Sequence, residues 1–331
     1  MCHYHHPTLE EREKATQLIL TGYSISAVAR ELGRSPSTIS RERRRNKCGG
    51  KYKYLPSLAQ KKYIRRRKKC HRRRQFVPHS ALFEECRNKM AEHKWSPEEI
   101  VERRKLEGFP TVSFGTIYRA VADRLFNVKH LGKGRGRGVK LLRRKGKGRH
   151  PHVAPRIKNH FEGCLPLAKR PEIANQRGRI GDWEADTIVG KNGGSCIITL
   201  VDRRTRYTII ARSPSKKTAD VIPIMIQMLK GQPAYTITPD RGPEFEHYKE
   251  LMEQLPNTVV YFPPARHPQD RGTNENTNGL LREYFPRGTD FNEYSEEYIQ
   301  KCMEELNKRP KKCLNYRTPY EVYNNVVLHL I

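Results

Sequence analysis

The sequence predicts a multidomain protein in which two all-α units precede an α/β domain. Capping residues and turn glycines mark short helices in residues 8–46 and 80–131, whereas from about residue 180 the chain changes to short apolar runs between turn residues. Charge divides the chain at a similar place, because residues 1–150 hold 39 of the 65 Lys and Arg but only 13 of the 35 Asp and Glu. The net charge of +30 therefore lies almost entirely in the N-terminal half.

The basic half is expected to bind a polyanion. Clustered positive charge attracts such partners through counterion release and long-range steering. We favour nucleic acid over a merely solvated charge run, because a solvated run would not concentrate in one half.

Cysteine usage and hydropathy exclude several other classes of protein. The eight Cys form no CxxC pair, which argues against a zinc ribbon and against a disulfide framework. A metal site at Cys2, His3, His5 and His6 is a weaker alternative to a frayed terminus. No apolar stretch approaches about 18 residues and no signal pattern begins the chain. We therefore expect a soluble protein of a reducing compartment such as the cytoplasm, without a membrane partner.

Three short helices are expected within residues 1–46. A capping box of Thr8 and Glu11 begins the first helix, and Ser35 followed by Pro36 begins the third. This order of elements is typical of a helix-turn-helix, whose last helix enters the major groove of DNA. A generic small helical bundle is the alternative. We favour DNA binding because the outward face of the third helix carries Ser37, Thr38, Arg41, Arg44 and Arg45.

Two basic segments are expected to contact phosphates without reading sequence. Residues 47–79 form a connector with the candidate contacts Arg65, Arg66, Arg67, Arg72 and Arg73. Residues 132–175 begin with a Gly-interleaved basic run and are expected to be a flexible linker that orders on DNA. Its candidate contacts are Arg135, Arg137, Arg143 and Arg144. A nuclear address is a weaker interpretation of such runs.

Residues 80–131 are expected to form a second helix-turn-helix. Ser96 and Glu99 make another capping box, and Ser113 begins a further helix. That helix carries the candidate DNA contacts Thr116, Tyr118 and Arg119. A packing module without DNA contacts is the alternative.

Residues 176–331 show the pattern of an α/β domain. Strands are expected at 183–189, 196–201, 207–211, 235–238 and 259–262, and helices at 218–229, 245–255, 275–284 and 295–308. Pro223 lies inside the first of these helices and should kink it or move its start. Three antiparallel strands, a crossover helix, and further strands alternating with helices describe a ribonuclease-H-like layer of the retroviral-integrase type.

Three acidic residues are the candidate catalytic residues of this domain. Asp186 lies in a predicted strand, Asp240 follows another, and Glu275 begins a predicted helix. Carboxylates that converge from such places can bind two divalent cations, the arrangement that cuts and joins phosphodiesters. Asp182 and Glu184 share the strand face of Asp186, which is costly unless cations or solvent compensate the charge.

Other acids are interpreted as structural. Asp202 ends the second predicted strand near a turn, and Glu244 is expected to cap a helix or to face solvent. No Ser/His/Asp hydrolase elbow, P-loop or dinucleotide fingerprint is found, which removes the commoner competing chemistries.

The sequence resembles DDE transposases of the bacterial insertion-sequence family numbered thirty. The resemblance lies in the segments WEADTIVGK, TPDRGPEF, RGTNENTNGLLREYFPRGTDF and NKRPKKCLNYRTPYEVY, and extends upstream to VARELGRSPSTISRERRRN, WSPEEIVERR and TIYRAV. By position it implies that Asp186, Asp240 and Glu275 are catalytic and bind two Mg²⁺ (or Mn²⁺) ions, and that Arg282 is the basic residue that follows the glutamate. The roles of Asp182 and Asp270 nearby stay open.

The resemblance also implies what the protein does. It would bind the terminal inverted repeats of an insertion sequence, free 3′-hydroxyl ends and join them to target DNA, as a homodimer or larger assembly on double-stranded DNA. A catalytically silent repressor derived from a transposase is the alternative, and a nuclease or resolvase is a third. The repressor would be expected to have lost one of the three acids, and none is missing.

Overall fold

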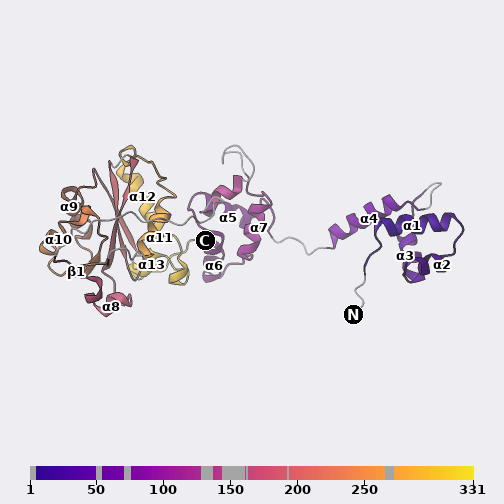
Figure 1. Cartoon of the computed structure of the whole chain (residues 1–331), viewed down its shortest axis with the longest axis horizontal. Helices are drawn as coiled ribbons and strands as arrows, with labels where there is room; N and C mark the ends of the chain where they lie inside the picture. Colours follow the sequence, from indigo (N-terminus) through magenta and orange to yellow (C-terminus); the bar gives the residue numbers. More distant parts are fainter. Residues whose placement is uncertain are drawn as a thin grey trace. The chain divides into compact units, whose positions relative to one another are not determined.

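The computed structural model describes residues 5–49, 54–70, 76–127, 137–143, 161, 163–191, 194–264 and 272–331. The chain forms two compact units, residues 1–75 and 76–331, whose elements are labelled in Figure 1. Among the described residues, no helix is both long and apolar enough to span a membrane.

The first unit consists of helices α1 (Leu9–Leu20), α2 (Ile25–Glu31), α3 (Pro36–Arg45) and α4 (Pro56–Lys69). The predicted capping box is confirmed, because the Thr8 hydroxyl accepts from the Glu11 amide and the Glu11 carboxylate accepts from the Thr8 amide. Helix α4 lies within the predicted basic connector, which was not expected to contain a helix, and its Ala59 is fully buried. The sequence did not predict this helix, because a single buried alanine in a run of basic residues leaves almost no periodic pattern of apolar residues.

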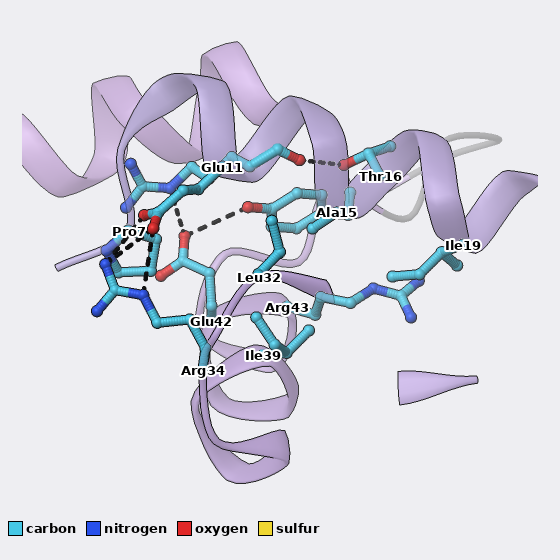
Figure 2. Close-up of a pocket in the computed structure, with 12 residues that line it drawn as sticks. Pro7, Glu11, Ala15, Thr16, Ile19, Leu32, Arg34, Ile39, Glu42 and Arg43 are labelled. Atoms are coloured by element: carbon cyan, nitrogen blue, oxygen red, sulfur yellow. Dashed lines mark hydrogen bonds and ion pairs between the residues drawn. The ribbon is translucent and has the colours of Figure 1, made fainter. Parts of the chain in front are cut away.

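A buried ion pair ties α3 to α1. The Arg12 side chain is 1% exposed, and its Nε lies 2.7 Å from Oε1 of Glu42, which also accepts from the Tyr54 hydroxyl at 3.3 Å. A second pair joins Arg34 Nη2 to Glu11 Oε1 at 2.9 Å. Figure 2 shows both carboxylates at the small apolar pocket between these helices. These ion pairs on the inner side of α3 therefore fix the position of the helix and of its outward face.

The second unit begins with three helices, α5 (Ala81–Ala91), α6 (Pro97–Leu106) and α7 (Phe114–Ala122), followed by a 3-10 turn, η2 (Arg137–Leu141). The predicted caps at Ser96 and Ser113 are present. Phe83, Trp95 and Phe126 lie in the core of this helical part, against which Leu330 and Ile331 also pack.

A six-stranded sheet forms the remainder of the second unit, in the order β1-β6-β5-β2-β3-β4. Its strands are β1 (Leu165–Pro166), β2 (Asp182–Val189), β3 (Cys196–Asp202), β4 (Thr208–Ser213), β5 (Thr236–Thr238) and β6 (Val259–Phe262). Strands β2, β3 and β4 pair antiparallel, whereas β5 pairs parallel with both β2 and β6. The predicted ribonuclease-H-like topology is confirmed by this mixed order.

Helices cover both faces of the sheet (Figure 1). On one face, α9 (Thr218–Leu229) and α10 (Tyr248–Gln254) bury a core that includes Trp183 and Ala185. On the other, α11 (Gly272–Leu281) and α12 (Glu296–Asn307) cover Ile188 and Ile197. Helix α9 still begins at Thr218 with Pro223 inside it, so the proline does not move the start.

Short elements complete this part, namely η3 (Leu167–Lys169), α8 (Glu172–Asn175), η5 (Pro243–Phe245), η7 (Phe291–Glu293), η8 (Lys312–Leu314) and α13 (Pro319–Asn324). Strand β1, η3 and α8 lie in residues 132–175, so this range is not wholly a linker. A two-residue strand and a four-residue helix are too short to produce a periodic signal in the sequence.

Buried arginines join the helical part to the α/β part of this unit. Arg103 of α6 pairs with Glu321 of α13, with Nη1 and Oε2 2.7 Å apart. Arg309 pairs with Glu99 at 3.0 Å and with Glu283 at 3.2 Å. Both guanidinium groups are about 2% exposed or less, and each has two carboxylate partners.

Candidate active site and nucleic-acid interface

Two of the three predicted catalytic carboxylates lie on neighbouring strands. Asp186 is in the middle of β2, and Asp240 is two residues beyond the end of β5. The parallel register pairs Asp182 with Thr236 and Glu184 with Thr238, the last residue of β5. Both Asp186 and Asp240 are half-buried. Asp240 thus follows the carboxyl end of the strand that pairs with the strand of Asp186.

Helix α11 brings the third predicted residue to the same face of the sheet. The amide of Asn278 donates from Nδ2 to Oδ2 of Asp186 at 3.0 Å. Glu275 lies one helical turn before Asn278, on the same face of α11, and is exposed. Asn278 was not among the predicted site residues, although its position three residues after Glu275 is a signal that could have identified it.

The carboxylates do not form a complete set of metal ligands in this structure. Among the described residues, no group of three or more His, Cys, Asp or Glu is arranged to hold a metal ion. The donor set nevertheless suits a hard divalent cation, because carboxylate and amide oxygens are the ligands that Mg²⁺ and Mn²⁺ prefer.

Two other acids of β2 are compensated by arginines. Asp182 is buried, lies 3.0 Å from Arg179 Nε and accepts from the Thr236 hydroxyl at 2.8 Å. Glu184 is also buried and pairs with Arg203. The sequence suggested that metal ions or solvent compensate the negative charge of Asp182 and Glu184. In the structure, arginine side chains compensate it, so both acids have structural partners.

Asp202 and Glu244 have different roles. Asp202 is structural as predicted, since its carboxylate accepts from the backbone amides of Gly181 and Thr205. The expectation that Glu244 caps a helix or faces solvent is wrong, because this residue is 0% exposed. Its Oε1 lies 2.9 Å from Lys216 Nζ and accepts from the Thr187 hydroxyl at 2.7 Å. The sequence gives no signal for a pair that joins distant segments.

Lys216 forms an ion pair with Glu244 and also experiences the charges of Asp240 and Asp186. Burial lowers the pKa of its ammonium, but the charge and hydrogen bond of Glu244, followed by the charges of Asp240 and Asp186, outweigh that effect and raise the pKa. The lysine therefore stays protonated in the negative potential of the site.

Two predicted DNA-binding arginines contact the region around α11. Arg143 donates from Nη1 to Oδ1 of Asn276 at 3.1 Å, so one residue of the predicted linker contacts the residue that follows Glu275. Arg282 donates from Nη2 to the carbonyl of Val189 at 2.9 Å. Its guanidinium braces the end of β2 in this structure, and a phosphate contact by Arg282 stays a prediction.

The outward faces of α3, α4 and α7 carry the remaining predicted DNA contacts. Exposed members are Ser37, Arg41, Arg44, Arg45, Arg65, Arg67, Tyr118 and Arg119, whereas Thr38, Arg66 and Thr116 are half-buried. Arg66 donates to Oδ1 of Asn46 at 2.6 Å and so has a structural partner. Arg72, Arg73, Arg135 and Arg144 lie outside the described residues, as do Cys2, His3 and Asp270, and Arg137 is described only as backbone.

Parts of the chain are similar to known domains. A family described as a helix-turn-helix domain matches residues 3–46. The structure is similar to the catalytic core domain of BIV integrase, at 19% identity and a TM-score of 0.35, over 43% of this chain and 93% of that chain.

Two relatives match nearly the whole chain. The transposase for insertion sequence element IS4351 from Bacteroides fragilis is 35% identical, over 97% of this chain and 96% of its own length. Transposase InsI for insertion sequence element IS30A from Escherichia coli (strain K12) is 33% identical, over 96% of this chain and 83% of its own length. The chain therefore belongs to the IS30 family of insertion-sequence transposases.

Proposed function

We propose that this protein is an active DNA transposase that binds the terminal inverted repeats of its element, cleaves to free 3′-hydroxyl ends and transfers those ends into target DNA. The observation that supports this proposal is the pairing of the strand of Asp186 with the strand that Asp240 follows, together with the hydrogen bond from Asn278 of the helix of Glu275 to Asp186. The full-length match to transposases supports the same activity.

In this proposal, Asp186, Asp240 and Glu275 hold two Mg²⁺ (or Mn²⁺) ions. When bound, such ions activate the attacking water or 3′-hydroxyl and stabilise the leaving oxygen of the phosphodiester. Asn278 fixes the orientation of the Asp186 carboxylate through its 3.0 Å hydrogen bond. Glu275, exposed on the first turn of α11, completes the ligand set when DNA and cations arrive.

The DNA contacts are proposed to divide into two kinds. The N-terminal residues of α3, with Ser37, Thr38 and Arg41, read base edges in the major groove, and α7 supplies a second reading helix through Thr116, Tyr118 and Arg119. Arginines of α4 contact phosphates. Because two element ends must be joined, a homodimer or larger assembly on DNA in the cytoplasm is part of the proposal.

Carboxamide substitution tests the catalytic assignment. Asp186→Asn, Asp240→Asn and Glu275→Gln should each abolish nicking of a duplex that carries the terminal repeats in Mg²⁺, while a gel shift shows that repeat binding is retained. Glu246→Gln is the matched control, because Glu246 is exposed on the segment that follows Asp240. A Glu275→Gln protein that nicks as fast as wild type would remove Glu275 from the triad. Wild-type protein that binds the repeats but never nicks them would instead indicate a silent repressor.

A further inference from the structure

Glu244 and Lys216 form an ion pair near the proposed metal site, and the proposed reaction gives neither residue a role. Glu244 lies in η5, four residues after Asp240, and Lys216 lies in the loop between β4 and α9. Their ion pair spans 2.9 Å, and the Glu244 side chain is completely buried, whereas the Lys216 side chain is partly exposed. Lys216 thus supplies the cation that a buried carboxylate requires as a partner.

The same carboxylate ties together the two segments that carry the catalytic aspartates. Its Oε1 accepts from the hydroxyl of Thr187, which directly follows Asp186 in β2. Glu244 itself follows the turn that begins at Asp240, where Asp240 Oδ1 accepts from the Gly242 amide at 2.8 Å. Glu244 therefore links the strand of Asp186 to the turn of Asp240.

The second oxygen of Glu244 faces the Asp240 turn without a partner. Oε2 is buried and makes no hydrogen bond. A Cβ added to Gly242 would clash with this oxygen and would lie 2.7 Å from Asp240 Oδ1, so both carboxylates crowd the same glycine. An unsatisfied buried oxygen beside a second carboxylate creates a strongly negative local potential.

We propose that Glu244 and Lys216 act as a positioning pair that sets the divalent-cation affinity of the active site, an inference that rests on the proposed function. Glu244 retains the charge of Lys216 and so keeps it from neutralising Asp186 and Asp240. Without Glu244, the ammonium is attracted to the two aspartates and competes with the incoming cation. The pair is neutral as a whole and therefore adds no net charge next to the two aspartates.

This pairing predicts opposite effects for its two members. Glu244→Gln removes a negative charge and frees Lys216, so cation affinity should fall about tenfold or more, since tenfold requires only about 1.4 kcal/mol. Adding Lys216→Gln to Glu244→Gln removes the competing charge as well. The double variant should return to within about threefold of the wild-type affinity, a recovery that a purely structural role would not produce.

The experiment is a Mn²⁺ titration of the full-length protein, followed by electron paramagnetic resonance of free Mn²⁺. Circular dichroism establishes that each variant is folded, and Glu246→Gln is the control that should bind as wild type does. If Glu244→Gln fails to fold, the comparison of Lys216→Arg with Lys216→Gln replaces it. The arginine variant keeps the charge and should bind as wild type, whereas the glutamine variant should differ in affinity.

The outcomes separate this inference from the proposed function. Loss of Mn²⁺ binding in Asp186→Asn, with unchanged binding in Glu244→Gln, overturns the positioning pair alone. A double variant no tighter than Glu244→Gln overturns it too, as do Lys216→Arg and Lys216→Gln proteins with equal affinity. Wild-type protein that binds no Mn²⁺, or whose binding survives Asp186→Asn, overturns the metal assignment and this inference with it.

Discussion

Glu321→Gln is expected to destabilise the second unit strongly. Glu321 is 1% exposed, and its two oxygens accept from Nη1 and Nη2 of Arg103 at 2.7 and 2.9 Å. Backbone amides of Thr318 and Leu328 also donate to it. A glutamine keeps the size of the side chain but removes its charge, and leaves Arg103 buried with Glu107 as its remaining carboxylate.

The magnitude follows from the pKa of this carboxyl. Burial raises the pKa of Glu321, but the hydrogen bonds from Arg103 and from the two amides outweigh that effect and lower it from 4.5 to about 2. Such a shift corresponds to about 3 kcal/mol of folding free energy, within the range of about 3–5 kcal/mol typical for breaking a buried pair. The folded-state pKa is depressed, so this stabilisation is present above about pH 4.5 and is lost as the pH falls toward 2.

Urea unfolding followed by tryptophan fluorescence measures this loss. The chain has two Trp residues, and both report on the second unit: Trp95 lies in the helical core and Trp183 in the sheet core. With a slope of about 3 kcal/mol/M, the midpoint should fall by about 1 M. Glu304→Gln is the control, because its pair with Lys308 is exposed and should contribute less than about 0.5 kcal/mol.

Two results would refute the reasoning. One is a loss below about 1 kcal/mol for Glu321→Gln at neutral pH. The other is a loss of stability at acid pH that is the same in the variant as in the wild type. The variant lacks the group whose protonation destabilises the wild type between pH 4.5 and 2.

Three further substitutions test the site and the first unit. Asn278→Ala removes the hydrogen bond to Asp186 and should slow nicking at least tenfold without changing repeat binding in a gel shift; equal rates would exclude a positioning role. Gly242→Ala places a methyl group against Glu244 and Asp240 and should reduce nicking below detection in the same assay, while the melting temperature shows whether the fold survives. Arg12→Met leaves Glu42 buried without its arginine and should cost the first unit about 3 kcal/mol, seen as a lower thermal midpoint in circular dichroism; a midpoint shared with Thr21→Ala, at an exposed position, would contradict this.

Local signals predicted much of the fold. The capping boxes of Thr8 with Glu11 and of Ser96 with Glu99 form as expected, because a cap depends on residues three positions apart. Strand β6 spans the expected residues 259–262, since four apolar residues between turns leave little freedom in their assignment. Helix α4 was missed because its buried face is a single small residue.

The surroundings of the candidate site were harder to predict. The three acids Asp186, Asp240 and Glu275 stand out in the sequence. As expected, Asp186 lies within a strand, Asp240 follows one, and Glu275 lies in the first turn of a helix. Glu244 and Lys216 gave no such signal, because their contact joins segments that only the folded sheet brings together. The roles of all five stay predictions until the substitutions are measured.

The packing of Leu330 and Ile331 has a consequence for synthesis of the chain. These residues contact the core of the helical part, and the Glu107 carboxylate accepts from the backbone amides of both. A ribosome translates residues 76–127 long before it reaches them, so the helices emerge with part of their apolar surface still uncovered. This apolar surface of nascent chains should therefore need shielding by a chaperone until Leu330 and Ile331 have been translated, so the helical part reaches its native state late.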